Sequence, residues 1–179
     1  MSHALVVDDK ESGRRSLRAE LEDGGFDVTV AASAHDALKA LEDLDPSLIV
    51  TDFQMPDIDG IEFLRRVRAF SDVPIVVITA YDSPELRRRS LETGATHVLN
   101  FLRDLASLGP LAQELVRTAS SNSRRPSREA TRTREQVLKQ AKIERVYLDC
   151  DGNVSETSRR LSKSRGSVRY QLRKLGIEV

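Results

Sequence analysis

The chain has 179 residues, enough for one domain of ordinary size and a second small one, and its 28 basic residues balance 28 acidic ones. No apolar run approaches the ~20 residues of a membrane span, and the first residues lack the basic-then-apolar pattern of a signal peptide. A single cysteine, Cys150, excludes an internal disulfide and agrees with a reducing compartment. We therefore expect a cytoplasmic protein with no membrane partner.

Charge is distributed unevenly along the chain. Residues 1–117 contain 13 basic and 21 acidic residues, whereas residues 118–179 contain 15 basic and 7 acidic ones. Opposite charge in the two halves indicates two separate roles, and a compact basic module commonly binds a polyanion.

Apolar runs and helical periods alternate through the first 119 residues. Short runs rich in β-branched residues predict strands over residues 4–7, 26–30, 48–52, 74–79 and 95–99. Segments with apolar residues at helical spacing predict helices over residues 11–22, 34–44, 61–67, 84–93 and 111–119. Five strand-then-helix units predict an α/β fold in residues 1–119, with a doubly wound five-stranded parallel sheet and right-handed crossovers.

The remaining residues follow a different pattern. Residues 120–131 have no apolar period and are predicted to form a flexible linker. Three helices are expected in residues 132–179, over residues 132–149, 154–161 and 167–175. A tight turn that includes Gly166 joins the last two helices, which is typical of a helix-turn-helix that lays its last helix in a DNA major groove. We therefore expect a second, small all-α domain over residues 132–179.

Acidic residues follow the first and third expected strands. Asp8 and Asp9 come directly after the first strand, and Asp52 ends the third. Because these strand ends are neighbours in a doubly wound sheet, we expect the three carboxylates to converge. A divalent cation relieves their mutual repulsion, and hard oxygen ligands with open water positions suit Mg²⁺. Taken singly, each acid is equally typical of a turn or a helix cap.

A metal at this cluster indicates phosphoryl chemistry. With the charge of an incoming phosphate neutralised, Asp52 can attack phosphorus as a nucleophile and become an aspartyl phosphate. Thr79 ends the fourth expected strand and would offer its hydroxyl to that phosphoryl group. The alternative for Thr79 is a hydroxyl that is bonded locally at the end of its strand.

Four short motifs carry a family resemblance: Val7-Asp8-Asp9, Thr51-Asp52 with Met55-Pro56 and Gly60, Ile78-Thr79-Ala80, and Gly94-Ala95. Together they resemble the flavodoxin-like receiver domain of two-component response regulators, over residue 1 to about residue 119. The resemblance implies that Asp9, Asp52 and the backbone carbonyl of Gln54 bind Mg²⁺, with Asp8 helping through water. It also implies that a sensor histidine kinase supplies the phosphoryl group to Asp52.

The loop after the fifth strand departs from the family pattern. Receivers of this type carry Lys-Pro there, with an aromatic residue three positions before the Lys, but these positions hold Phe101-Leu102 and Val98. Loss of the Lys removes the positive charge that would pair with a phosphoryl oxygen and draw the loop toward it. Coupling of phosphorylation to this loop should therefore suffer more than metal binding. Arg103, in the same loop, is the candidate to reach back in place of the Lys, although a solvated surface arginine is its ordinary interpretation.

The last expected helix has a basic surface. Arginine can bind guanine or phosphate with two hydrogen bonds, and residues at the start of a helix can bind phosphate. Residues 152–161 and 164–177 resemble a Fis-type helix-turn-helix, and with a receiver before it the chain resembles the RegA/PrrA/ActR class of short response regulators. The resemblance implies dimerisation through the preceding helix. The predicted DNA-binding residues are Ser164, Arg165, Ser167, Arg169, Tyr170, Arg173 and Lys174.

Two functional hypotheses follow. In the first, the protein is a response regulator that binds double-stranded DNA as a homodimer and is controlled by phosphorylation of Asp52. In the alternative, an atypical receiver regulates DNA binding independently of phosphorylation, through dimerisation or a partner protein. An enzyme is disfavoured because Gln54 stands where an aspartyl phosphatase of the haloacid dehalogenase type holds its second Asp. His3, His35 and His97 have no metal-ligand spacing.

Overall fold

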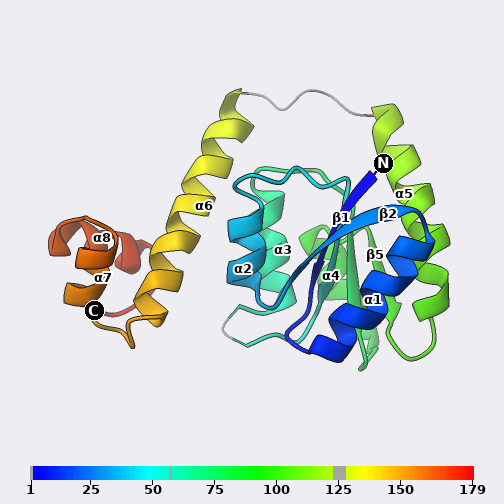
Figure 1. Ribbon diagram of the computed structural model, residues 1–179, viewed down its shortest axis with the longest axis horizontal. Coiled ribbons are helices and arrows are strands. Elements are labelled where there is room, and N and C mark those ends of the chain that lie inside the picture. The colour runs from blue at the N-terminus through cyan, green and yellow to red at the C-terminus, as the bar shows by residue number, and fades with distance from the viewer. Residues whose placement is uncertain (1, 57, 123–127) are drawn as a thin grey trace.

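The computed structural model describes residues 2–56, 58–122 and 128–179 (Figure 1). Five parallel strands form one sheet in the order β2-β1-β3-β4-β5. The doubly wound parallel sheet expected from the sequence is therefore confirmed, including the adjacency of the first and third strands. The strands are β1 (Ser2–Val7), β2 (Phe26–Ala31), β3 (Leu48–Asp52), β4 (Ile75–Thr79) and β5 (His97–Asn100).

Helices cover both faces of this sheet. The helices of the first half are α1 (Glu11–Asp23), α2 (Ala34–Ala40), α3 (Gly60–Arg68), α4 (Pro84–Thr93) and α5 (Leu108–Asn122), with a short 3₁₀ turn η1 (Leu105–Ser107) before α5. Side chains alternate along each strand, so Leu5 and Val7 pack with α2 and α3, whereas Ala4 and Val6 pack with α1 and α5. All four strand residues are fully buried, as expected for a parallel sheet covered on both sides.

Three further helices follow, namely α6 (Arg128–Leu148), α7 (Val154–Arg160) and α8 (Arg165–Lys174). Ile143 from α6 packs with Val168 and Leu172 from α8 in a small apolar cluster. The side chain of Asn153 caps α7 and that of Ser164 caps α8, each by accepting backbone N–H groups of the first turn. None of the helices in the described ranges is both long and apolar enough to cross a membrane.

The helices extend further into the predicted linker than the sequence pattern indicates. Of residues 120–131, residues 123–127 lie outside the described residues, but α5 continues to Asn122 and α6 begins at Arg128. Ser120 and Ser121 donate their hydroxyls to backbone carbonyls one turn earlier, at 2.8 and 2.7 Å. The last turn of α5 is therefore built from polar residues, which have no apolar period by which the sequence could predict a helix.

Helix α2 is shorter than predicted. Its period suggested a helix as far as Leu44, but α2 ends at Ala40 and a turn follows. The carbonyls of Leu41 and Leu44 accept hydrogen bonds from Arg134 of α6 instead of completing a helical turn. The carbonyls that follow α2 are therefore bound by a side chain that is distant in the sequence.

Candidate functional site

The three acidic residues after β1 and at the end of β3 meet at one edge of the sheet. Val7 pairs with Thr51 in the β1–β3 register, so the next residues, Asp8 and Asp52, emerge side by side. One carboxylate oxygen from each of Asp8, Asp9 and Asp52 lies within 4.8 Å of the others. The predicted convergence is therefore present in the fold.

The loop between β1 and α1 holds Asp8 tightly. Its carboxylate accepts the Lys10 backbone N–H at 2.7 Å and packs so closely on Gly13 that a Cβ there would lie 2.1 Å from an Asp8 oxygen. Arg14 donates to the backbone carbonyls of Asp8 and Asp9, at 2.8 and 3.0 Å. These contacts fix the loop and the position of the Asp8 carboxylate.

The carboxyl of Asp52 is a weaker acid than that of an ordinary aspartate. Burial raises its pKa, the negative charge of Asp8 raises it further, and the pKa reaches about 6. Hydrogen bonds from the backbone N–H groups of Gln54 and Phe53 and the positive charge of Lys10 act in the opposite direction but are weaker. At neutral pH the carboxylate is mostly ionised, but it is destabilised by its surroundings and would gain from a cation.

The donor set fits a hard divalent cation. One Asp9 carboxylate oxygen is buried without a hydrogen-bond partner, which is costly unless a ligand satisfies it. Three converging carboxylates of this kind match the preference of Mg²⁺ for oxygen ligands. Asp8, Asp9 and Asp52 would hold the ion, and the backbone carbonyl of Gln54 stays a predicted fourth ligand.

Lys10 brings a cation close to Asp52. Its ammonium nitrogen lies 4.0 Å from an Asp52 carboxylate oxygen, and the Lys10 side chain is 65% exposed. Arg103, the candidate substitute for the missing lysine, instead pairs with Asp82 at 3.0 Å, and Asp82 also binds Arg87 at 2.8 Å. The positive charge at the acidic cluster therefore comes from the β1–α1 side and not from the loop after β5.

Thr79 is placed at the end of β4 as predicted, and its hydroxyl is bonded locally. The hydroxyl accepts the backbone N–H of Tyr81 at 3.1 Å and donates to the Tyr81 carbonyl at 3.3 Å. The side chain is 1% exposed. In this conformation the Thr79 hydroxyl is bonded to the backbone of its own loop, which was the alternative interpretation of this residue.

Asn100 organises the loop in which the family lysine would stand. Its side-chain oxygen accepts the backbone N–H groups of Leu102 and Arg103, at 2.9 and 3.1 Å. Phe101 packs against the apolar layer under α1 and α5, and Val98 is buried. Asn100 was not among the predicted site residues, although an Asn at the end of a strand signals such a turn.

The predicted DNA-binding residues form one surface of α8. Ser164, Arg165, Ser167, Arg169, Tyr170, Arg173 and Lys174 are all exposed. Val168 and Leu172 on the opposite side are fully buried, so the orientation of the helix agrees with the prediction. The Lys174 ammonium lies 5.2 Å from the centre of the Tyr170 ring, a cation–π contact.

Comparison with known proteins identifies the first half of the chain. Residues 4–100 match the response regulator receiver domain family. The KDP operon transcriptional regulatory protein KdpE of Escherichia coli is 36% identical over 100 residues, which are 56% of this chain and 44% of KdpE. The transcriptional regulatory protein TrcR of Mycobacterium tuberculosis is 35% identical over 136 residues, 75% of this chain and 52% of TrcR. The chain thus spans about half the length of these relatives.

Solved structures agree. The receiver domain of the Francisella response regulator 1452 superposes with a TM-score of 0.63 at 27% identity, covering 66% of this chain and 99% of that one. Sequence, sheet order and the acidic edge all point to the same family. The chain belongs to the response regulator receiver domain family.

The raised pKa of Asp52 predicts a stabilising substitution. A carboxyl with a pKa of about 6 when folded and 3.8 as the reference value destabilises the folded state when ionised. The penalty is complete above about pH 6 and declines as the pH falls toward 3.8. In EDTA at pH 7.5, Asp52→Asn should therefore raise the free energy of unfolding by about 1–3 kcal/mol, measured by urea titration. The gain should shrink at pH 4.5, and the exposed control Asp43→Asn should change little at either pH.

The position of Lys10 predicts a change in metal affinity. Lys10→Met removes a positive charge 4.0 Å from Asp52, so Mg²⁺ should bind about 3- to 10-fold more tightly by titration calorimetry. Lys39→Met, an exposed lysine on α2, is the matched control and should leave Mg²⁺ affinity unchanged. Equal affinity in Lys10→Met and the parent protein would mean that the ammonium does not act on the acidic cluster.

Proposed function

We propose that the protein is a DNA-binding transcriptional response regulator whose receiver accepts a phosphoryl group on Asp52. The observation that carries this proposal is the convergence of Asp8, Asp9 and Asp52, with one Asp9 oxygen left unpaired, in a member of the receiver family. The names of KdpE and TrcR as transcriptional regulatory proteins support a role in transcription. A sensor histidine kinase is the proposed phosphoryl donor.

The chemistry assigns one role to each side chain. An Asp52 carboxylate oxygen attacks phosphorus, the bond between phosphorus and the donor histidine nitrogen breaks, and that nitrogen retains the bonding electron pair. Bound Mg²⁺ would neutralise the phosphoryl oxygens, with Asp8 and Asp9 holding the ion. Lys10 adds a second positive charge on the exposed side of Asp52. Thr79 could donate its hydroxyl to the phosphoryl group only by giving up its bond to the Tyr81 carbonyl.

The second half of the chain is proposed to bind DNA. We assign residues 1–119 to the receiver and residues 132–179 to a Fis-type helix-turn-helix domain that binds double-stranded DNA as a homodimer. Support comes from the cap of α8 at Ser164, from the burial of Val168 and Leu172, and from the exposed basic residues on the rest of the helix surface. The excess of positive charge in residues 118–179 suits a phosphate backbone.

A second candidate function has specific support. A receiver with Phe101 in the lysine position, Val98 in the aromatic position and Thr79 bonded to Tyr81 lacks the parts by which the family is expected to transmit phosphorylation. Under this alternative the domain regulates DNA binding without phosphorylation, through dimerisation or a partner protein.

Phosphorylation separates the two candidates. Incubation with acetyl phosphate and Mg²⁺ should add one phosphoryl group to the intact protein, detected by mass spectrometry, because Asp52 is ionised and a metal site adjoins it. The adduct should be absent in Asp52→Asn and present in the exposed control Asp43→Asn. Absence of an adduct from both acetyl phosphate and a kinase partner would favour the phosphorylation-independent candidate.

Substitutions on α8 test DNA binding. Arg165→Ala and Arg169→Ala should each weaken binding to a selected duplex by about 1–3 kcal/mol and relax its sequence preference, measured by fluorescence anisotropy at several salt concentrations. Arg88→Ala on α4, which also removes an exposed arginine, should leave binding unchanged. Unchanged affinity and preference in both α8 variants would show that this helix does not read DNA.

A further inference from the structure

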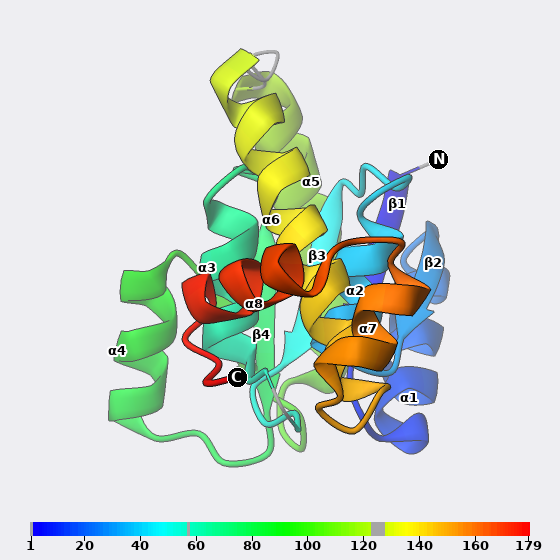
Figure 2. The ribbon, with the colours of Figure 1, turned by 90° about the vertical axis from the view of Figure 1, so that its left-hand side faces the viewer.

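Helix α6 packs along the face of the receiver that α2 and α3 form (Figures 1 and 2). Leu138 and Ala141 of α6 are 7% and 4% exposed and belong to the same apolar cluster as Leu38 and Leu41. That cluster continues to the sheet, so α6 contributes to the receiver core. Helix α6, the first helix of the proposed DNA-binding domain (residues 132–179, here called the basic domain), is therefore also a covering layer of the receiver.

Polar contacts at both ends of this interface fix the position of α6. Near its start, Arg134 donates to the carbonyl oxygens of Leu41 at 2.7 Å and Leu44 at 3.0 Å. Near its end, Arg145 forms an ion pair with Asp36 at 2.8 Å. These contacts are separated by three turns of helix, so α6 is held along its length.

A buried ion pair lies next to the second contact, because Glu144 directly precedes Arg145 on α6. Glu144 of α6 binds Arg66 of α3 at 2.7 Å, and their side chains are only 12% and 16% exposed. Burial raises the pKa of Glu144, but His35, 3.5 Å away, and Arg66 outweigh burial and bring it to about 2, so the carboxylate is ionised. Separating the pair leaves Glu144 without Arg66 and leaves Arg66 paired only with Glu62 of its own helix, at 3.0 Å, which makes partial displacement of α6 unfavourable. The interface therefore favours two arrangements, docked or released.

Helix α3 connects this ion pair to Asp52. It begins at Gly60, whose N–H donates to the Phe53 carbonyl at 2.9 Å. A Cβ at Gly60 would lie 2.5 Å from the Asp52 carbonyl oxygen, so the start of α3 is in direct contact with the backbone of Asp52. Arg66 lies six residues further along, about 9 Å on the same rigid helix. The contact with Asp52 and the contact with Glu144 are therefore made by the same helix.

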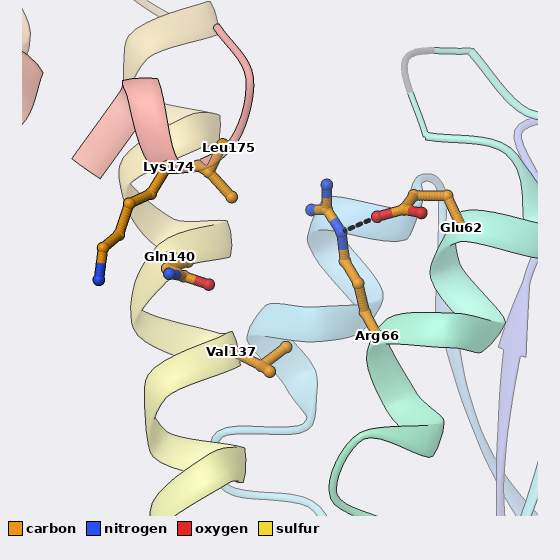
Figure 3. A pocket seen from close by; sticks show the side chains of 6 residues that line it. All are labelled: Glu62, Arg66, Val137, Gln140, Lys174 and Leu175. Atoms are coloured by element: carbon orange, nitrogen blue, oxygen red, sulfur yellow. Dashed lines mark hydrogen bonds and ion pairs between the residues drawn. The ribbon is translucent and has the colours of Figure 1, made fainter. Parts of the chain in front are cut away.

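On its other side α6 forms part of the basic domain. Ile143 is 1% exposed and packs with Val168 and Leu172. Between α3 and the end of α8 there is a pocket of about 230 Å³ next to Arg66 (Figure 3). Its lining residues are Glu62, Arg66, Val137, Gln140, Lys174 and Leu175.

We propose that the α2–α3 face is the surface through which the receiver acts on the basic domain, and that its partner is the chain's own helix α6. The Arg66–Glu144 pair holds α6 in place, and a phosphoryl group on Asp52 shifts α3 and loosens it. The phosphorylation of Asp52 rests on the proposed function, whereas the docking of α6 does not. Neither Phe101 nor Val98 lies on this route, so it operates without the lysine and aromatic residue that are absent from β5 and its loop.

Docking is tested by hydrogen exchange on the full chain. Glu144→Gln removes the charge that Arg66 faces, so the α6 amides should exchange about tenfold faster than in the parent protein. Glu135→Gln, an exposed glutamate on the same helix, should leave exchange unchanged. Glu144→Gln could also lower the melting temperature of the whole chain. In that case Arg134→Ala tests the docking of α6 through a different contact, the bonds to the Leu41 and Leu44 carbonyls, without unpairing a buried charge.

Coupling is tested by loading Asp52 with beryllofluoride and Mg²⁺, a phosphoryl mimic. Altered exchange at residues 53–56 reports loading, and faster exchange in α6 reports release. The parent protein should show both changes, and Glu144→Gln should show only the first because its α6 is already released. Loading without a change in α6 overturns the inference. Absence of any change at residues 53–56 overturns loading and the proposed function, while unchanged α6 exchange in Glu144→Gln and Arg134→Ala would overturn the docking itself.

Discussion

Repulsion among three carboxylates at the ends of β1 and β3 is the constraint to which the neighbouring structure conforms. Gly13 leaves room for the Asp8 carboxylate, and Arg14 holds the carbonyls of the β1–α1 loop. Gly60 allows α3 to start against the backbone of Asp52. The ionised cluster is unfavourable by itself, because burial raises the pKa of Asp52 most and the negative charge of Asp8 raises it further, and a cation would offset both effects. The fold therefore keeps the acidic edge ready for a ligand at the expense of its own stability.

The acidic edge could be predicted because it depends on local patterns and one topological rule. Strand periodicity located Asp8, Asp9 and Asp52, and right-handed crossovers made β1 and β3 neighbours. The orientation of α8 was equally accessible, since Val168 and Leu172 lie at helical spacing. These inferences require no knowledge of how distant helices pack.

The interface of α6 could not be predicted in this way. Arg66 and Glu144 are 78 residues apart, and nothing in the local pattern of either helix indicates that they meet. His35 was set aside because it has no metal-ligand spacing, yet it is buried beside Glu144. Similarly, Arg103 pairs with Asp82, which belongs to a different loop. The sequence alone does not reveal this contact, which gives Arg103 a partner other than the acidic cluster.

The exposure of the basic residues of α8 has a consequence for how quickly the protein could find a binding site. Arg165, Arg169 and Arg173 are accessible while α6 is docked on the receiver. Electrostatic attraction to a polyanion acts at long range and is independent of sequence, so it operates in the docked arrangement as well. If residues 132–179 bind DNA as proposed, diffusion along DNA can therefore proceed before any signal arrives, and a signal that releases α6 governs how long the protein stays at a site once it is reached.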